Sequence, residues 1–147
     1  MAVKAVIDTN IWVSALINPH GLPASLRQAF DEGLFTAVIS APLLDELRDV
    51  LSRPRIKEKC AITDEDILSL LLLIEELSEE TTLTGDVALC RDPNDNMIIE
   101  TAVRGKAKYL ISGDKDIADD KEVLSYLSHH GVSVISPSTF LSVINKT

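Results

Sequence analysis

The sequence is poor in cysteine and has no long hydrophobic run. Cys60 and Cys90 stand apart from each other, outside any CxxC or histidine-spaced zinc pattern. Two unclustered thiols suit a reducing compartment better than a secreted disulfide scaffold, so we expect a cytoplasmic protein whose cysteines serve packing. The longest apolar run, residues 70–74, is far shorter than the roughly 20 residues of a membrane span. We therefore expect no membrane contact and, since the first strand starts at once, no signal peptide.

The sequence also has little positive charge. Its 14 lysines and arginines face 23 aspartates and glutamates, which gives a net charge of -9. A protein this acidic does not coat nucleic acid by bulk electrostatics, so any contact with nucleic acid must be local. The length of 147 residues and the 46% hydrophobic content indicate one globular domain spanning residues 1–147.

What the chain does have is a regular alternation of short apolar runs and helical patterns. The expected strands are residues 3–8, 35–40, 81–83, 108–112 and 132–136. The expected helices are residues 10–17, 23–33, 41–52, 64–80, 96–104 and 119–129, with a last helix starting near Pro137. The segment around Asp92 is typical of a turn, and Gly105 is expected to end the helix at residues 96–104. This alternation predicts a parallel sheet covered by helices.

Acidic residues follow two of these strands. Asp8 ends the first strand, and Asp114 and Asp116 follow the strand at residues 108–112. In open parallel sheets, ligands bind beyond the C-terminal ends of the strands, so these acids are candidates for a site. Asp8 could instead only cap the next helix, although Asn10 could also fill that role.

Two further acids lie on helices. Glu46 sits at the edge of the apolar stripe of helix 41–52, whereas Asp45 points away from it. Glu46 is therefore a candidate site residue, although a simple boundary position is equally compatible with this pattern. Asp95 precedes Ile98 and Ile99 by three and four residues, which puts it on the apolar side of its helix. Because uncompensated burial of a carboxylate is costly, we expect a bound cation or a basic partner there.

Together these acids form a candidate metal site. Carboxylates repel one another unless a cation lies between them, and hard oxygen ligands suit Mg²⁺ or Mn²⁺. Sites of this kind support phosphodiester chemistry. The candidate metal ligands and catalytic residues are Asp8, Glu46, Asp95, Asp114 and Asp116.

Much of the scarce positive charge lies in one short segment. Four residues there are candidates for contact with a phosphate backbone: Arg48, Arg53, Arg55 and Lys57. The same segment could equally be an ordinary solvated loop.

The helix at residues 64–80 is apolar around nearly its whole circumference. One core-facing stripe does not require this, so a second buried face is implied. We expect a homodimer.

The motifs resemble those of the PIN-domain family of nucleases, in particular the bacterial and archaeal branch of toxins in toxin–antitoxin pairs. The matching residues are Ile7-Asp8-Thr9-Asn10, Glu46, Arg91-Asp92-Pro93-Asn94-Asp95-Asn96 and Ser112-Gly113-Asp114-Lys115-Asp116. The resemblance implies a three-layer α/β/α fold with a parallel five-stranded sheet of order 3-2-1-4-5. It also implies an acidic quartet of Asp8, Glu46, Asp95 and Asp114, with Asp116 as an auxiliary acid and Asn10 and Ser112 as orienting groups.

The activity implied by this resemblance is Mg²⁺- or Mn²⁺-dependent hydrolysis of single-stranded RNA, with water attacking phosphorus in line. The implied partners are RNA and an antitoxin protein. A non-catalytic PIN-type scaffold that binds RNA or protein would carry the same acids. A phosphatase of the haloacid-dehalogenase type is less favoured, since Asn10 and Ala118 stand where that class needs acids. A dinucleotide-binding domain is disfavoured because no GxGxxG follows the first strand.

Overall fold

The computed structural model describes residues 3–113 and 115–145, without the side chains of Lys115 and Asp116. Its sheet has five parallel strands: β1 (Lys4–Ile7), β2 (Thr36–Ile39), β3 (Glu79–Glu80), β4 (Tyr109–Ile111) and β5 (Ser133–Ile135). Their order is β3-β2-β1-β4-β5, which confirms the predicted 3-2-1-4-5 sheet. Because β1 and β4 are neighbours, with Ile7 opposite Ile111, the residues that follow these two strands lie side by side at the C-terminal ends of the strands.

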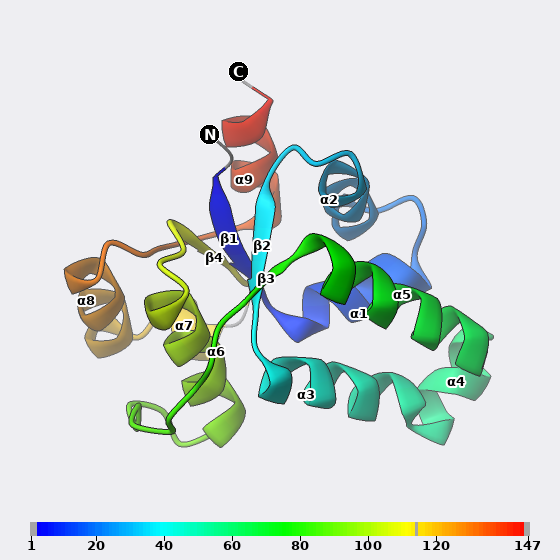
Figure 1. Cartoon of the computed structure of the whole chain (residues 1–147), viewed down its shortest axis with the longest axis horizontal. Coiled ribbons are helices and arrows are strands. Elements are labelled where there is room, and N and C mark those ends of the chain that lie inside the picture. Colours follow the sequence, from blue (N-terminus) through cyan, green and yellow to red (C-terminus); the bar gives the residue numbers. More distant parts are fainter. Residues whose placement is uncertain (1–2, 114, 146–147) are drawn as a thin grey trace.

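Nine helices are seen in the described residues. They are α1 (Thr9–Ile17), α2 (Leu22–Asp31), α3 (Ala41–Ser52), α4 (Pro54–Cys60), α5 (Asp64–Leu77), α6 (Pro93–Arg104), α7 (Lys115–Ala118), α8 (Lys121–His129) and α9 (Pro137–Ile144). Figure 1 shows α1, α2 and α5 on one side of the sheet and α6 and α8 on the other. None of these helices combines the length and apolar character that a membrane crossing requires.

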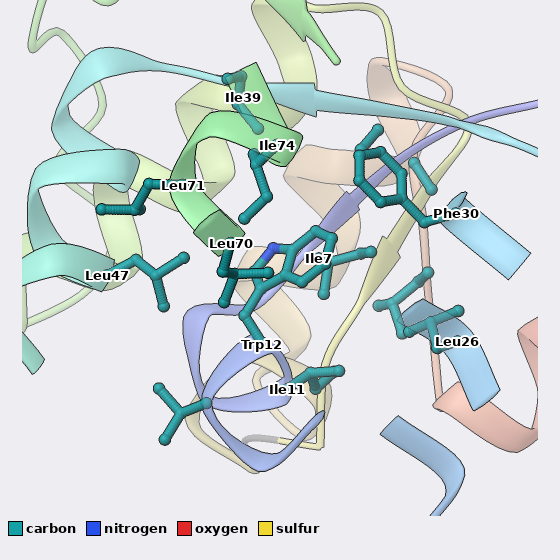
Figure 2. Packing of buried hydrophobic residues seen from close by; sticks show 14 of the residues in the cluster. Ile7, Ile11, Trp12, Leu26, Phe30, Ile39, Leu47, Leu70, Leu71 and Ile74 are labelled. Atoms are coloured by element: carbon teal, nitrogen blue, oxygen red, sulfur yellow. The ribbon is translucent and has the colours of Figure 1, made fainter. Parts of the chain in front are cut away.

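The two faces of the sheet bury separate sets of side chains. Successive side chains of a strand point to opposite faces. Ala5 and Ile7 pack with α1, α2, α3 and α5, whereas Val6 packs with α6 and α8. Figure 2 shows the first cluster, in which Trp12 meets the edge of Phe30 with ring centroids 5.3 Å apart. The sheet is therefore the middle of three layers.

Helix α6 is fixed against β2 at two points. The hydroxyls of Ser40 and Thr101 are buried and lie 2.9 Å apart. At the end of α6, a Cβ added to Gly105 would lie 2.2 Å from Cγ1 of Val38. Gly105 has an ordinary right-handed backbone with φ of -79°, so close packing rather than a left-handed cap explains this glycine. These two contacts hold the C-terminal half of α6 close to β2.

The third strand was predicted in the wrong place. Strand β3 lies at Glu79–Glu80 rather than at residues 81–83, because α5 ends at Leu77 instead of residue 80. Val38 and Ile39 of β2 pair with the two glutamates, and the N–H of Thr81 donates to the carbonyl of Ile39 at 2.8 Å. Pairing with β2 defines this edge strand.

Two short helices were not predicted, and one helix starts earlier than expected. Arg55 and Lys57 of the basic segment lie on α4, which no apolar stripe marks in the sequence, whereas Arg48 lies on α3 and Arg53 between the two helices. Helix α7 follows β4. Helix α6 begins at Pro93 rather than at residue 96 because Asp92 caps it: the Asp92 side chain accepts from the N–H of Asn94 at 2.9 Å. Proline at the first helical position loses no hydrogen bond.

Candidate active site

Asp8 is the acid at the end of β1, and it is buried, with 7% of its surface exposed. Its Oδ1 accepts a hydrogen bond from the backbone N–H of Asn10 at 3.2 Å and caps α1. The idea that Asn10 could cap this helix is wrong, because Asn10 lies in the first turn of α1. Capping engages Oδ1, so it does not account for the burial of Oδ2.

Ser112 supplies the second contact to Asp8. It follows β4, is buried, and its Oγ donates to Oδ2 of Asp8 at 2.8 Å. The carboxylate is therefore held from both oxygens by groups that its own strand and the neighbouring strand place there. Of the two predicted orienting groups, Ser112 uses its side chain, whereas Asn10 uses a backbone N–H and its side chain is exposed.

Glu46, on α3, is the described acid whose pKa the charge of Asp8 affects. It is half-buried, and burial is the largest cause that raises the pKa of its carboxyl above the ordinary value of 4.5. The negative charges of Asp8, Asp92 and Asp95 raise this pKa further, in that order. The positive charge of Arg53 acts in the opposite direction. The structure thus brings Asp8, Glu46 and Asp95 into one electrostatic neighbourhood.

Asp92 belongs to the same neighbourhood, although the sequence reasoning placed it in a turn and missed it. The signal was present: Asp followed by Pro marks a helix start. The carbonyl of Asp92 accepts from the N–H of Asp95 at 3.1 Å, so both acids lie in the first turn of α6. Helix N-termini favour negative charge, which lowers the cost of this arrangement.

An open cavity of about 630 Å³ lies beside these residues. It is lined by Arg91, Asp92 and Asp95 from the start of α6, and by Asp119 and Asp120 from the start of α8. Asp120 also caps α8 by accepting from the N–H of Glu122 at 2.9 Å. Asp119 and Asp120 were not predicted as site residues, although paired acids before a helix are a visible signal.

Asp114 lies outside the described residues, and the side chain of Asp116 is not described. Of the five predicted ligands, the described side chains are those of Asp8, Glu46 and Asp95. Within the described side chains, no three histidine, cysteine or acidic groups lie close enough to share a metal ion. The donors that converge are nevertheless carboxylates, and Mg²⁺ commonly binds through one or two carboxylates together with water and substrate phosphate. The donor set fits such an ion.

The basic segment borders the acids. Arg53 ends α3 and is close enough to lower the pKa of Glu46, while it also pairs with Asp49 at 3.1 Å. Arg48 and Arg55 are exposed. Lys57 forms an ion pair with Asp64 and so ties α4 to α5. Of the four predicted nucleic-acid residues, Lys57 has the clearest structural role.

A tight hydrogen-bond network anchors the loop that precedes α6. Oε2 of the buried Glu100 accepts from the N–H of Thr84 and from Nε of Arg104, both at 2.7 Å. Its Oε1 accepts from the N–H of Gly85 at 3.0 Å. Burial alone would raise the pKa of Glu100, but the hydrogen bonds outweigh it and hold the pKa below 4.5.

Comparison with known proteins identifies the fold family. A family model described as "PIN domain" matches residues 4–116. An uncharacterized protein of Methanocaldococcus jannaschii is 30% identical over 146 residues, which are 98% of this chain and 93% of that protein. The matched region contains β1, α3, the start of α6 and β4, the elements that bring the acids together. The chain therefore belongs to the PIN-domain family, whose members are generally nucleases.

Proposed function

We propose that the protein is a Mg²⁺- or Mn²⁺-dependent endoribonuclease that hydrolyses phosphodiester bonds of single-stranded RNA in the cytoplasm. The observation that carries the proposal is the buried carboxylate of Asp8, which the Ser112 hydroxyl holds at 2.8 Å where β1 and β4 end. Glu46 supports it, since the charges of Asp8, Asp92 and Asp95 add to burial in raising the pKa of its carboxyl. Carboxylates that influence one another in this way destabilise one another's charged forms, and a bound cation offsets that repulsion.

Each described residue of the site has a role in this proposal. Asp8, Glu46 and Asp95, with Asp114 and Asp116, would hold the ion. Such an ion activates water and stabilises negative charge on phosphate oxygens. The Ser112 hydroxyl fixes the orientation of the Asp8 carboxylate by its 2.8 Å hydrogen bond. Fixed ligands lose little free energy in reorganising when charge develops during the reaction.

RNA is the proposed substrate because part of the chain's scarce positive charge lies beside the acids. Arg53 lies within the electrostatic reach of Glu46, and Arg48 and Arg55 are exposed nearby in sequence. Contacts of this kind hold a phosphate backbone without reading its bases. Lys57 can add to the local positive potential even while paired with Asp64.

The role of a toxin, with an antitoxin protein as its partner, rests on the resemblance of the sequence motifs. We include it in the proposal as the biological setting of the nuclease. Inhibition of RNA cleavage by the protein product of an adjacent gene would support this setting. Undiminished cleavage in the presence of that product would count against it.

The second candidate function is a scaffold that binds RNA or protein without cutting it. The same acids would be present in both cases, so only metal-dependent cleavage separates them. The test incubates the purified protein with end-labelled single-stranded RNA in Mn²⁺, Mg²⁺ or a chelator. We expect fragments with either ion and none with the chelator. Single-stranded DNA and double-stranded RNA of the same sequence serve as controls for the substrate, and intact RNA under all three conditions would favour the scaffold.

A further inference from the structure

A second cavity, of about 330 Å³, has no part in the proposed chemistry of the acid cluster, which is Asp8, Glu46, Asp92 and Asp95. Its walls are largely apolar and come from three segments. Pro42 belongs to the first turn of α3, Leu83 and Val87 to the loop before α6, and Pro93 and Met97 to α6 itself.

The position of this cavity ties it to the acids. Pro42 precedes Glu46 by four residues on α3, so their side chains share one face about 6 Å apart along the helix. Pro93 directly follows Asp92 in the chain. The two helices that carry the acids therefore also frame the cavity. A nucleotide whose phosphate lies at the acids can reach the cavity with an adjoining base.

One wall of the cavity carries a buried ionised group. Glu100 lines it with only 3% of its surface exposed. In the described residues, Oε2 accepts from Thr84 and Arg104, whereas Oε1 accepts one hydrogen bond, from Gly85. Since a carboxylate oxygen can accept two, Oε1 has capacity for one more donor. The amino group of a base is a donor that carboxylates accept.

The cavity is also held in shape without a ligand. Glu100 fixes the loop at Thr84 and Gly85, and Asn96 fixes it at Leu89 and Cys90. Oδ1 of Asn96 accepts from the N–H groups of these two residues at 3.0 and 2.8 Å. Both ends of the loop are thus bonded to α6. A preformed cavity binds with a smaller ordering cost.

We propose that this cavity binds one nucleobase of the single-stranded RNA, adjacent to the nucleotide whose phosphate lies at the acid cluster. The assignment rests on the proposed nuclease function for its substrate. Apolar walls accept the flat faces of a base, and Oε1 of Glu100 accepts from an amino group on its edge. The volume lies at the low end of small-molecule sites, which suits a single base rather than a peptide helix.

The test combines abasic substrates with cavity variants. A fluorescent 12-nucleotide RNA is made as a series in which one nucleotide at a time lacks its base. Binding is measured by anisotropy in a chelator, where metal-dependent cleavage cannot occur. For the unaltered protein we expect one position at which loss of the base weakens binding about five- to tenfold, a size comparable to base stacking.

The variant Leu83→Trp fills the cavity and should abolish the penalty at that position. Leu34→Trp is the matched control, since Leu34 is exposed and lies before the N-terminal end of β2, away from the residues that line the cavity. The control should keep the full penalty. Met97→Ala enlarges the cavity instead of filling it. This variant provides a second test of the cavity if circular dichroism shows that Leu83→Trp does not fold. Met97→Ala should reduce the penalty.

Equal binding of all abasic substrates by the unaltered protein would overturn the proposal. An unchanged penalty in both cavity variants would do the same. Cleavage is scored separately on the intact RNA with Mn²⁺. Position-specific binding without cleavage would support the base site and contradict the nuclease, whereas cleavage without position-specific binding would do the reverse.

Discussion

At the scale of single residues, Asp8 combines a structural and a chemical position. Its Oδ1 caps α1, and its Oδ2 accepts from Ser112. A cap alone would leave the second oxygen to water, since most capping residues are exposed at a helix start. Burial with a dedicated donor on the neighbouring strand holds the carboxylate in one orientation. That arrangement is the kind of preorganisation a metal ligand requires.

The first prediction concerns Asp95. Asp95→Asn should reduce metal-dependent cleavage at least about 100-fold, since loss of even an outer-shell partner of a metal site costs 10–100-fold. Without metal, the variant should be at least as stable as the unaltered protein, because one negative charge leaves a crowded cluster. Cleavage rates are paired with melting curves with and without Mn²⁺.

Asp45→Asn is the matched control, since Asp45 is exposed on α3 beside Glu46. It should leave both cleavage and the Mn²⁺-induced rise in melting temperature unchanged. If Asp95→Asn behaves like this control, Asp95 is not part of the site and the acids do not form a metal centre.

The second prediction concerns Glu100, whose pKa is lowered by hydrogen bonds that outweigh its burial. A carboxyl with a lowered folded-state pKa stabilises the protein above its unfolded pKa of about 4.5, and this stability is lost as the pH falls through the folded value. Glu100→Gln should therefore cost about 1.5–3 kcal/mol at pH 7. The cost should shrink as the pH falls below about 4.5.

Urea unfolding at a series of pH values measures this difference. Glu75→Gln on α5 is the control, because Glu75 is exposed. The control should change stability little at any pH. A cost for Glu100→Gln that stays constant between pH 7 and pH 4 would contradict the role given to its charge.

Among single residues, the sequence predicts the positions of those acids that follow from the spacing of apolar residues. Asp8 ends an apolar run, and Glu46 and Asp95 lie at the borders of apolar helix faces, so each could be placed from spacing alone. Asp92 was missed although the Asp92-Pro93 pair marks a helix start, because periodicity alone starts that helix three residues later. Glu100 was also missed: its partners Thr84 and Gly85 lie in a loop whose course the sequence does not determine.

At the scale of elements, the regular alternation of strands and helices was predictable, and the exceptions have physical causes. Strand β3 consists of two exposed glutamates and is defined only by pairing with β2. Helix α4 has seven residues and none of them is buried, so no apolar stripe marks it. Strand β3 depends on pairing with a distant segment, and α4 lacks the apolar periodicity by which a helix is predicted, so a local pattern reveals neither.

The third prediction belongs to α4 and the end of α3. Replacing Arg53 and Arg55 with Ala should weaken RNA binding to a similar extent for all sequences, since phosphate contacts carry no base information. The slope of log K against log salt should fall by about one for each lost phosphate contact. Filter binding at several salt concentrations gives both quantities. Stability should change little, since the Arg53–Asp49 pair is exposed.

The control for this prediction removes the same amount of charge elsewhere. Arg27→Ala with Lys108→Ala takes away two positive charges, from α2 and from the residue before β4. We expect nearly unchanged RNA affinity for this pair. Equal losses for both double variants would mean that only net charge matters and that the basic segment has no special role.

At the scale of the whole molecule, the net charge of -9 would limit how the proposed RNA substrate approaches. Long-range repulsion opposes association, and it is screened at physiological salt over about 8 Å. Under the proposed function, RNA binding depends on the few arginines near the acids and on the apolar cavity framed by α3 and α6. An acidic surface with one small basic segment favours local contacts with a flexible single strand over contacts with a rigid duplex.

The last prediction is that the protein forms a homodimer through α5. Ile67, Leu70, Leu71 and Ile74 of α5 face the core, but Leu68 and Leu72 are 55% and 54% exposed and lie one turn apart. Two neighbouring exposed leucines on one helix face are costly in water unless another surface covers them, and a second copy is the simplest cover.

Light scattering at micromolar concentration should give twice the chain mass for the unaltered protein. Leu68→Glu with Leu72→Glu should give a monomer, because four glutamates would otherwise be buried in a symmetric interface. Leu22→Glu with Leu34→Glu is the matched control, since these leucines are similarly exposed but lie at and after α2. The control should remain dimeric. A monomeric mass for the unaltered protein would refute the dimer, and a dimeric mass for the α5 variant would move the interface to another face.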